Sequence, residues 1–305
     1  MRKILLFLTI GIGTLSMTVP AHAQQTVYAI ANGGTTLIRF QTNNPGAATA
    51  VGNFNGGATF LDAIDFRPLN GQLYGYLDAT DTLYSVDLNT ATLTVVSNTG
   101  TGTNTNLLGM DFNPLIDRVR VVTDSTQNLV YNPNTNAAPT VATSLFYKTG
   151  DVNEFSNALI IDNAYSKNVA GAFATSTQYA IDYGLGILTT LNNNLGELTT
   201  IGSLGVSINK SAPYVGFDIF TTLTGIDTAY AVLDTTAGNA PSLYTINLAT
   251  GLASSVGTVG GGFNQVYSLA VTPSVAPEPG TLFLVGLGLT VLIAPRRRSV
   301  SSGHK

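Results

Sequence analysis

The stretch Gly109-Met110-Asp111-Phe112-Asn113-Pro114 decides how this 305-residue chain folds. It is a short apolar strand with an aspartate inside it, and an Asn-Pro turn signal follows. Related stretches recur about every fifty residues: Ala63-Ile64-Asp65-Phe66, Ile160-Ile161-Asp162 and Gly216-Phe217-Asp218-Ile219. A fifth copy, Ser268-Leu269-Ala270-Val271, has alanine in place of the aspartate. The chain is therefore built from a repeat, and the repeat predicts its architecture.

Each repeat continues with further short strands, separated by turns rich in Asn, Gly, Pro and Asp. The expected second strands are residues 73–77, 119–123, 170–174 and 229–233. The third strands, most of which carry a tyrosine, are residues 83–87, 129–132, 178–182 and 243–247, and fourth strands follow at 92–96 and 254–257. Four short strands in about fifty residues are typical of one blade of a β-propeller.

The fifth repeat contains only its first strand before the pattern stops. Its missing second, third and fourth strands match residues 27–31, 37–41 and 48–51 at the other end of the chain. A closed ring would pair these two ends and remove an exposed sheet edge. The sequence therefore predicts an all-β, five-bladed propeller with four-stranded blades, closed by pairing of the N- and C-terminal strands.

The N-terminus has the pattern of a secretory signal peptide. Arg2 and Lys3 precede an apolar stretch at residues 4–19, and Ala21-His22-Ala23 is a small-residue cleavage site. We therefore expect a signal peptide at residues 1–23 and a single propeller domain at residues 24–276.

The C-terminus, residues 277–305, has the pattern of a sorting tail. Pro277-Glu278-Pro279 is followed by an apolar run at residues 281–294 and by Arg296, Arg297 and Arg298. As a helix the run would span roughly 21 Å, which is short for a bilayer core of about 30 Å. The arginines should stay cytoplasmic and leave the upstream domain outside. A plain C-terminal membrane anchor is the alternative interpretation.

This tail resembles the PEP-CTERM signal of Gram-negative bacteria that make extracellular polysaccharide. The resemblance implies a membrane enzyme, the exosortase, that recognises the Pro-Glu-Pro motif and removes the tail after a transient stay in the inner membrane. The body resembles an uncharacterised domain family of exported bacterial proteins. That resemblance rests on residues 109–114, on Asp65-Phe66-Arg67-Pro68 and on the Leu-Tyr-Ser-Val-Asp strand at 83–87. It implies no activity.

Composition excludes several kinds of site. The two histidines, His22 and His304, lie in the end segments, and the chain has neither Cys nor Trp. Nucleophilic sites that need His or Cys are excluded from the body, as are His- or Cys-ligated zinc, haem and iron–sulfur centres. The body holds 7 basic and 16 acidic residues, a net charge of −9. This charge argues against nucleic acid and anionic membrane surfaces as partners.

The repeated aspartates Asp65, Asp111, Asp162 and Asp218 are the main site candidates. If the first strand of each blade is innermost, they would face the central axis, where carboxylate oxygens suit Ca²⁺. The favoured alternative is that they bind backbone amides of the following turns. We predict no catalytic or cofactor-binding residue and expect the recurring tyrosines to pack between blades.

Two functions remain open. The favoured one is a non-enzymatic binding or scaffold module of the cell envelope or matrix, with extracellular polysaccharide or an envelope protein as partner. The alternative is a carbohydrate-active enzyme of the glycosidase type, which would need two Asp or Glu carboxylates about 5–9.5 Å apart. Glu154 and Glu197 are the only glutamates of the body, and neither lies in a recognisable motif.

Overall fold

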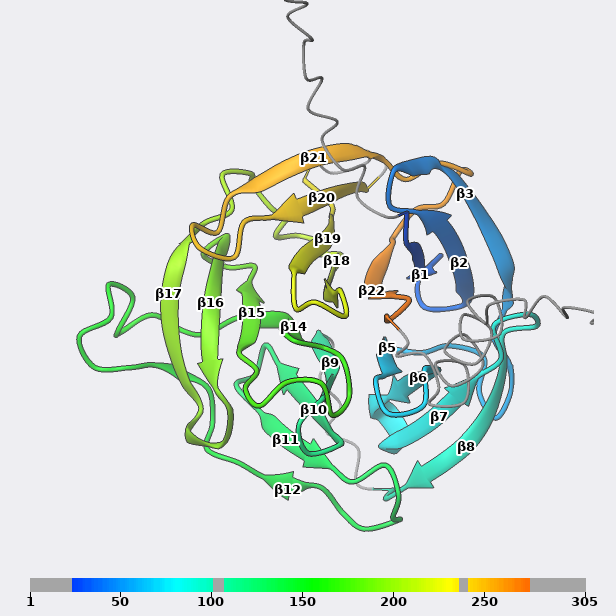
Figure 1. Ribbon diagram of the computed structural model, residues 1–305, viewed down its shortest axis with the longest axis horizontal. Coiled ribbons are helices and arrows are strands. Elements are labelled where there is room, and N and C mark those ends of the chain that lie inside the picture. Colours follow the sequence, from blue (N-terminus) through cyan, green and yellow to red (C-terminus); the bar gives the residue numbers. More distant parts are fainter. Residues whose placement is uncertain (1–23, 101–106, 236–240, 275–305) are drawn as a thin grey trace, which may run out of the picture.

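The computed structural model describes residues 24–100, 107–235 and 241–274. These residues form five sheets arranged around one axis (Figure 1), so the predicted five-bladed propeller is confirmed. The predicted signal peptide and sorting tail lie outside the described residues. Within the described ranges, no helix is long and apolar enough to cross a membrane.

Each blade is a sheet whose innermost strand carries a copy of the repeated motif. From the axis outward, blade A consists of β22 (Tyr267–Val271), β1 (Thr26–Ala31), β2 (Thr36–Gln41) and β3 (Asn44–Asn53). Blade B consists of β5 (Ala63–Arg67), β6 (Gln72–Leu77), β7 (Thr82–Val86) and β8 (Thr92–Asn98), with β4 (Asn55–Gly56) outside. Blade C consists of β9 (Leu108–Asn113), β10 (Arg118–Thr123), β11 (Asn128–Tyr131) and β12 (Thr140–Val141).

The last two blades follow the same order. Blade D consists of β14 (Ile160–Tyr165), β15 (Gln178–Asp182), β16 (Ile187–Asn192) and β17 (Glu197–Ser203), with β13 (Phe146–Tyr147) outside. Blade E consists of β18 (Val215–Thr221), β19 (Asp227–Leu233), β20 (Ser242–Ile246) and β21 (Ala253–Thr258). Two short 3₁₀ turns, Asp78–Thr80 and Asn193–Leu195, connect strands within blades B and D.

The ring closes in blade A, where β1 lies between β2 and β22. Val27 is paired with Val271 and Ala29 with Leu269 in antiparallel register. The amide of Thr272 donates to the carbonyl of Thr26 at 2.9 Å and continues the pairing beyond β22. The first and last described strands therefore complete one sheet, as the fragments of the repeat predict.

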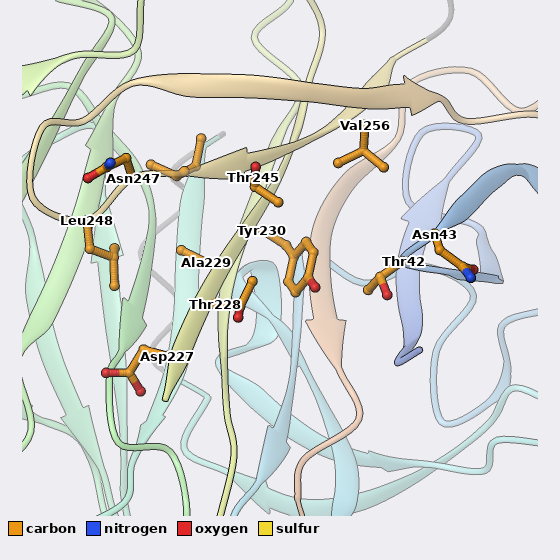
Figure 2. A pocket seen from close by; sticks show the side chains of 11 residues that line it. Thr42, Asn43, Asp227, Thr228, Ala229, Tyr230, Thr245, Asn247, Leu248 and Val256 are labelled. Atoms are coloured by element: carbon orange, nitrogen blue, oxygen red, sulfur yellow. The ribbon is translucent and has the colours of Figure 1, made fainter. Parts of the chain in front are cut away.

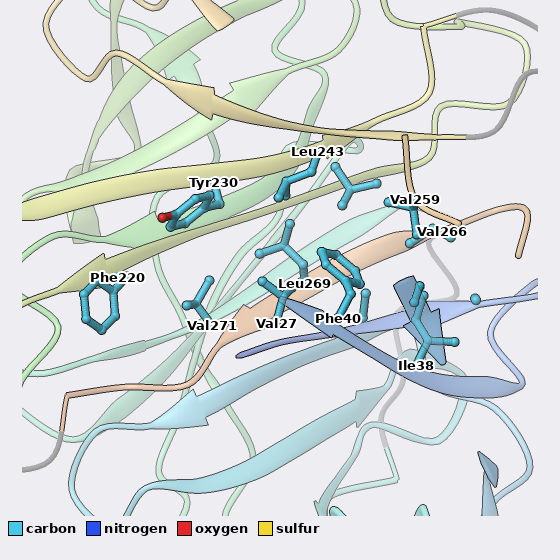
Figure 3. Packing of buried hydrophobic residues seen from close by; sticks show 14 residues of the cluster. Val27, Ile38, Phe40, Phe220, Tyr230, Leu243, Val259, Val266, Leu269 and Val271 are labelled. Atoms are coloured by element: carbon cyan, nitrogen blue, oxygen red, sulfur yellow. The ribbon is translucent and has the colours of Figure 1, made fainter. Parts of the chain in front are cut away.

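The hydrophobic core is divided among the five interfaces between neighbouring blades. Figure 3 shows the cluster between blades A and E, where Val27, Ile38 and Phe40 pack with Tyr230 and Leu243. Similar clusters lie between the other neighbouring blades. The predicted packing of repeated tyrosines between blades is seen at Tyr74, whose ring lies edge-on to Phe112 at 5.2 Å. Because both faces of an inner strand are covered, every residue of β5, β9, β14 and β18 is buried.

One strand prediction is wrong. Residues 170–174, expected to be the second strand of blade D, lie in a loop between β14 and β15. Lys167 and Gly171 both have positive φ, which turns the backbone out of an extended path. The Lys167 ammonium is held by the Asp227 carboxylate at 2.8 Å and by the Gly225 carbonyl at 2.5 Å. The expected third strand, at 178–182, is therefore the second strand of the blade.

Two short strands bridge neighbouring blades at the rim and have no counterpart in the predicted repeat. The strand β4 follows blade A but pairs in parallel with β8 of blade B, where Asn55 lies opposite Thr92. In the same way β13 follows blade C and pairs with β17 of blade D. These additions cover outer edges that would otherwise expose unpaired backbone groups.

Candidate functional site

The four repeated aspartates lie on the innermost strands β5, β9, β14 and β18 and face the centre of the ring. Each is at most 2% exposed. The inner strands are neighbours in one closed circuit, β22–β5–β9–β14–β18–β22. The structure therefore brings the four residues around one axis, as the sequence predicts for innermost first strands.

Each aspartate joins its own blade to the next one. The Asp65 carboxylate accepts from the amide of Phe66 at 2.7 Å and from the amide of Phe112, in blade C, at 2.8 Å. Asp162 makes the same pair of contacts with Asn163 in its own strand and Phe217 in blade E, at 2.9 and 2.8 Å. Asp218 accepts from Ile219 at 2.5 Å and from Val271 in blade A at 2.6 Å.

Asp111 accepts only one of the two amide hydrogen bonds that the other aspartates accept. Its Oδ2 accepts from the amide of Tyr165, in blade D, at a longer 3.3 Å. Its Oδ1 is buried and has no hydrogen-bond partner. One carboxylate oxygen near the axis is thus left without a donor.

The fifth interface, between blades A and B, uses a serine. Blade A has Ala270 where the other blades have aspartate, and Ser268 lies two residues earlier. The Ile64 amide donates to Ser268 Oγ at 2.9 Å, and this hydroxyl lies 3.4 Å from the Ile64 carbonyl. Ser268 was not among the predicted site residues, although a polar side chain near the lost aspartate was the available signal.

The glycines equivalent to Ser268 in blades C and E permit a close approach between inner strands. A Cβ atom on Gly109 would lie 2.3 Å from Asp162 Cα, and one on Gly216 would lie 2.7 Å from the Leu269 amide nitrogen. Such contacts are too short for any side chain. The small residue before each of these aspartates thus sets the distance across which the carboxylate reaches the next blade.

The favoured interpretation of these aspartates as turn formers is wrong. Their carboxylates bind amides of inner strands, and other groups hold the turns that follow. After β9, for example, it is Asn113 whose side chain accepts from the Leu115 amide at 2.9 Å. The reason is that Asp and turn residues are adjacent in sequence, but the aspartate side chain reaches the inner strand of the next blade.

Three of the four carboxylates form a compact group. Asp65, Asp111 and Asp218 each present an oxygen within 4.8 Å of the others, whereas Asp162 lies outside this group. Burial, together with the charge of the neighbouring aspartates, raises the pKa of Asp65 and Asp111 well above the ordinary value. Burial also raises the pKa of Asp218, to about 7. The ring therefore disfavours three negative charges at once unless a proton or a cation is present.

A hollow of about 230 Å³ opens at one end of the axis. Asp62, Leu108, Val215 and Tyr267 line it, and each stands three residues before the aspartate, or before Ala270, in its blade. The hollow therefore lies over the ring, at the end where the inner strands begin. We call it the axial mouth.

Two tyrosines form one wall of the axial mouth. The rings of Tyr214 and Tyr267 are stacked, with centroids 5.9 Å apart. The Gln265 amide donates to the Tyr214 hydroxyl at 2.7 Å, and the Tyr267 hydroxyl donates to the Leu61 carbonyl at 3.1 Å. Burial raises the pKa of Asp62 to about 6, and the negative charge of Asp78 adds to this effect. None of these wall residues was predicted from the sequence, because only the propeller brings them together.

A larger hollow of about 450 Å³ lies toward the rim, between blades E and A (Figure 2). Thr42, Tyr230, Thr245 and Asp227 are among its lining residues. Its carboxylate is already occupied: Asp227 binds the Lys167 ammonium at 2.8 Å and the Thr221 hydroxyl at 2.8 Å. This hollow therefore offers polar contacts but no unengaged acid.

The fold and its inner carboxylates define a class of protein, a five-bladed β-propeller whose neighbouring blades are joined around the axis by buried side chains. The chain belongs to the family described as Domain of unknown function (DUF4394), whose sequence profile matches residues 36–270. This range covers nearly the whole ring, and the predicted membership in an uncharacterised domain family is confirmed. No curated protein matches the chain.

Solved structures with a similar outline include a chain of a nidogen/laminin complex and a structural genomics protein of unknown function from Bacteroides thetaiotaomicron VPI-5482. The first is 10% identical over 83% of this chain and 100% of its own, with a TM-score of 0.46. The second is 16% identical over 83% of this chain and 68% of its own, also with a TM-score of 0.46. Neither likeness bears on function.

We predict that Asp162→Ala lowers the free energy of unfolding by about 2–4 kcal/mol, because it leaves two buried amides without an acceptor. The matched control is Asp87→Ala, which also removes two amide contacts, to Asn89 and Thr90, but at an exposed turn where water replaces them. Its loss should be much smaller. Urea unfolding of both variants measures the difference, and equal losses would refute a special role of the inner carboxylates.

Proposed function

We propose that this protein is an exported, non-enzymatic binding or scaffold module of the cell envelope or extracellular polysaccharide matrix, and that its axial mouth binds the ligand. The observation that carries the proposal is that the clustered acids are kept away from the accessible surface. The carboxylates that lie close together are buried and hold backbone amides. The open mouth is walled mainly by tyrosines and apolar side chains, and Asp62 is the one acid among its described lining residues.

The same observation weighs against the glycosidase alternative. Such an enzyme needs two carboxylates that flank a bound sugar. Asp65, Asp111 and Asp218 are close together but at most 2% exposed, so a sugar does not reach them. The two glutamates are engaged locally: Glu154 accepts from the Gly150 amide at 2.8 Å, and Glu197 accepts from the Asn192 side chain at 3.1 Å.

The axial mouth has the chemistry of a sugar-binding surface. Tyrosine combines an apolar ring, which packs on the face of a pyranose, with a hydroxyl that forms hydrogen bonds. In this mouth the Gln265 contact holds the Tyr214 ring in place. Asp62 provides a hydrogen-bond acceptor at the same opening, and Leu108 and Val215 provide apolar contacts. Neutral polysaccharide is the ligand class that we propose.

The positions of the two ends of the domain would leave the axial mouth free to face outward from a membrane. The strand β22 begins at the axial mouth with Tyr267 and runs away from it to Val271, where Val27 pairs with it. Both ends of the described domain therefore leave from the end of the ring opposite the mouth. A domain held at a membrane through its C-terminal side would present the mouth outward.

The second part of the proposal concerns export and cellular location. Residues 1–23 would direct export, and residues 277–305 would form a PEP-CTERM tail that an exosortase removes. The apolar run at 281–294 would hold the protein transiently in the inner membrane of a Gram-negative cell, with Arg296, Arg297 and Arg298 on the cytoplasmic side. The processed protein would then reach the envelope or the matrix.

The sorting step predicts that Glu278→Ala blocks removal of the tail in a bacterium that has an exosortase. The variant should accumulate as a larger species in the membrane fraction, whereas the wild type is processed. Immunoblots of fractionated cells measure both size and location, and a strain without exosortase is the control. Identical processing of wild type and variant would contradict the assignment.

The binding step predicts that the purified protein is retarded in affinity electrophoresis by the extracellular polysaccharide of its producing strain. Tyr214→Ala should weaken this retardation at least about tenfold, because truncating an aromatic anchor of a binding surface to alanine costs about 2 kcal/mol or more. Tyr183→Ala, in a different hollow, is the matched control and should bind normally. Equal binding by both variants would exclude the axial mouth, and hydrolysis of the polysaccharide would support the enzyme instead.

A further inference from the structure

The inner ring contains an arrangement that the sugar-binding proposal does not use. We propose that Asp65, Asp111 and Asp218 form a binding site for one hard divalent cation of the size of Ca²⁺, at the axis of the propeller. The site stands independently of the axial mouth's ligand, because it involves different residues and different chemistry.

The spacing of the oxygens fits this ion. One oxygen from each of the three carboxylates lies within 4.8 Å of the others. Calcium binds oxygen at 2.3–2.6 Å, so two of its ligands lie up to about 5 Å apart when they are on opposite sides of the ion. Magnesium binds at 2.0–2.1 Å and demands a near-ideal octahedron, whereas calcium tolerates the irregular geometry that carboxylates on three different strands impose.

A second observation points to a ligand. Asp111 Oδ1 is buried without a hydrogen-bond partner, while both oxygens of Asp65 and of Asp218 accept from amides. A buried carboxylate oxygen without a partner costs free energy, and a coordinated cation removes that cost. A carboxylate oxygen that accepts one amide retains a second lone pair, so Asp65 and Asp218 can also coordinate.

The surroundings of the group do not neutralise its charge with an ion pair. Among the described residues, the salt bridges join Arg67 to Asp117 and Lys167 to Asp227, and none involves the three aspartates. Arg120 is paired with Asp111 across β9 and β10, but its guanidinium donates to the side chains of Asn128 and Asn194, at 2.6 and 2.8 Å. A divalent cation would supply the missing positive charge.

The axial mouth is the hollow that lies over this end of the ring. Asp62 lines the mouth three residues before Asp65, and Leu108 and Val215 stand at the equivalent places before Asp111 and Asp218. A cation that approaches along the axis would meet the Asp62 carboxylate before it reaches the ring. The fourth aspartate, Asp162, lies outside the group, and both its oxygens accept from amides.

Asp162 therefore provides a matched control. The purified protein, stripped with EGTA, is titrated with CaCl₂ at pH 7.5 by calorimetry, and its melting temperature is measured in EGTA and in millimolar Ca²⁺. We expect one Ca²⁺ per chain and a rise in melting temperature of about 5 °C. Asp111→Asn should lose both effects, because an amide is a weaker ligand, although it can still accept from Tyr165. Asp162→Asn should retain both.

Three results would overturn the site. The first is no calcium binding by the wild type, which would mean that bound protons neutralise the negative charge of the three carboxylates. The second is calcium binding that Asp111→Asn retains in full. The third is a loss of binding in Asp162→Asn equal to that in Asp111→Asn. If Asp111→Asn does not fold, Asp218→Asn provides the same comparison, and the wild-type titration decides by itself whether a site exists.

Discussion

The hydrogen bond from an inner-strand amide to an aspartate of the preceding blade is the interaction on which this propeller depends. The innermost strand of each blade is a sheet edge. The amides on its free side have no partner in their own sheet and face the neighbouring blade. Since these edges are fully buried, water cannot satisfy them, and an unpaired buried amide costs about 1–3 kcal/mol. Asp65, Asp111, Asp162 and Asp218 each meet this need at one interface, and Ser268 meets it at the fifth.

This solution brings acids close to one another. A side chain long enough to reach the next blade from the inner strand also brings its carboxylate to the axis, where three of the four converge. Burial and mutual repulsion then raise their pKa values, so the ring gains blade-to-blade contacts and at the same time needs positive charge. The three aspartates that we propose to bind a cation are thus also residues that join neighbouring blades. The axial mouth, by contrast, is open, and three of its lining residues, Leu108, Val215 and Tyr267, begin inner strands.

Much of the fold could be predicted because the repeat is local. Alternating apolar strands and turn residues mark each blade, and the isolated strand at Ser268–Val271 requires the N-terminal strands to complete it. The prediction was wrong at residues 170–174, where apolar composition suggested a strand but positive φ at Lys167 and Gly171 makes a loop. The site was predictable only in part. That the aspartates face one axis follows from their equivalent positions, but their bonds to the next blade depend on the distance between strands far apart in sequence. The Tyr214–Tyr267 pair gives no sequence pattern, since only closure of the propeller brings the two aromatic rings together.

Hydrogen exchange of individual amides, followed by NMR at neutral pH, tests the central claim most directly. If the inner carboxylates hold the blades together, the amides of Phe112, Phe217 and Val271, and the Ile64 amide bound to Ser268, should exchange only when the whole domain unfolds. Their protection should equal that of central amides within a blade, such as Val121. If these amides exchange many times faster than Val121 while the blades stay folded, the contacts between neighbouring inner strands do not hold the ring, and the account is contradicted.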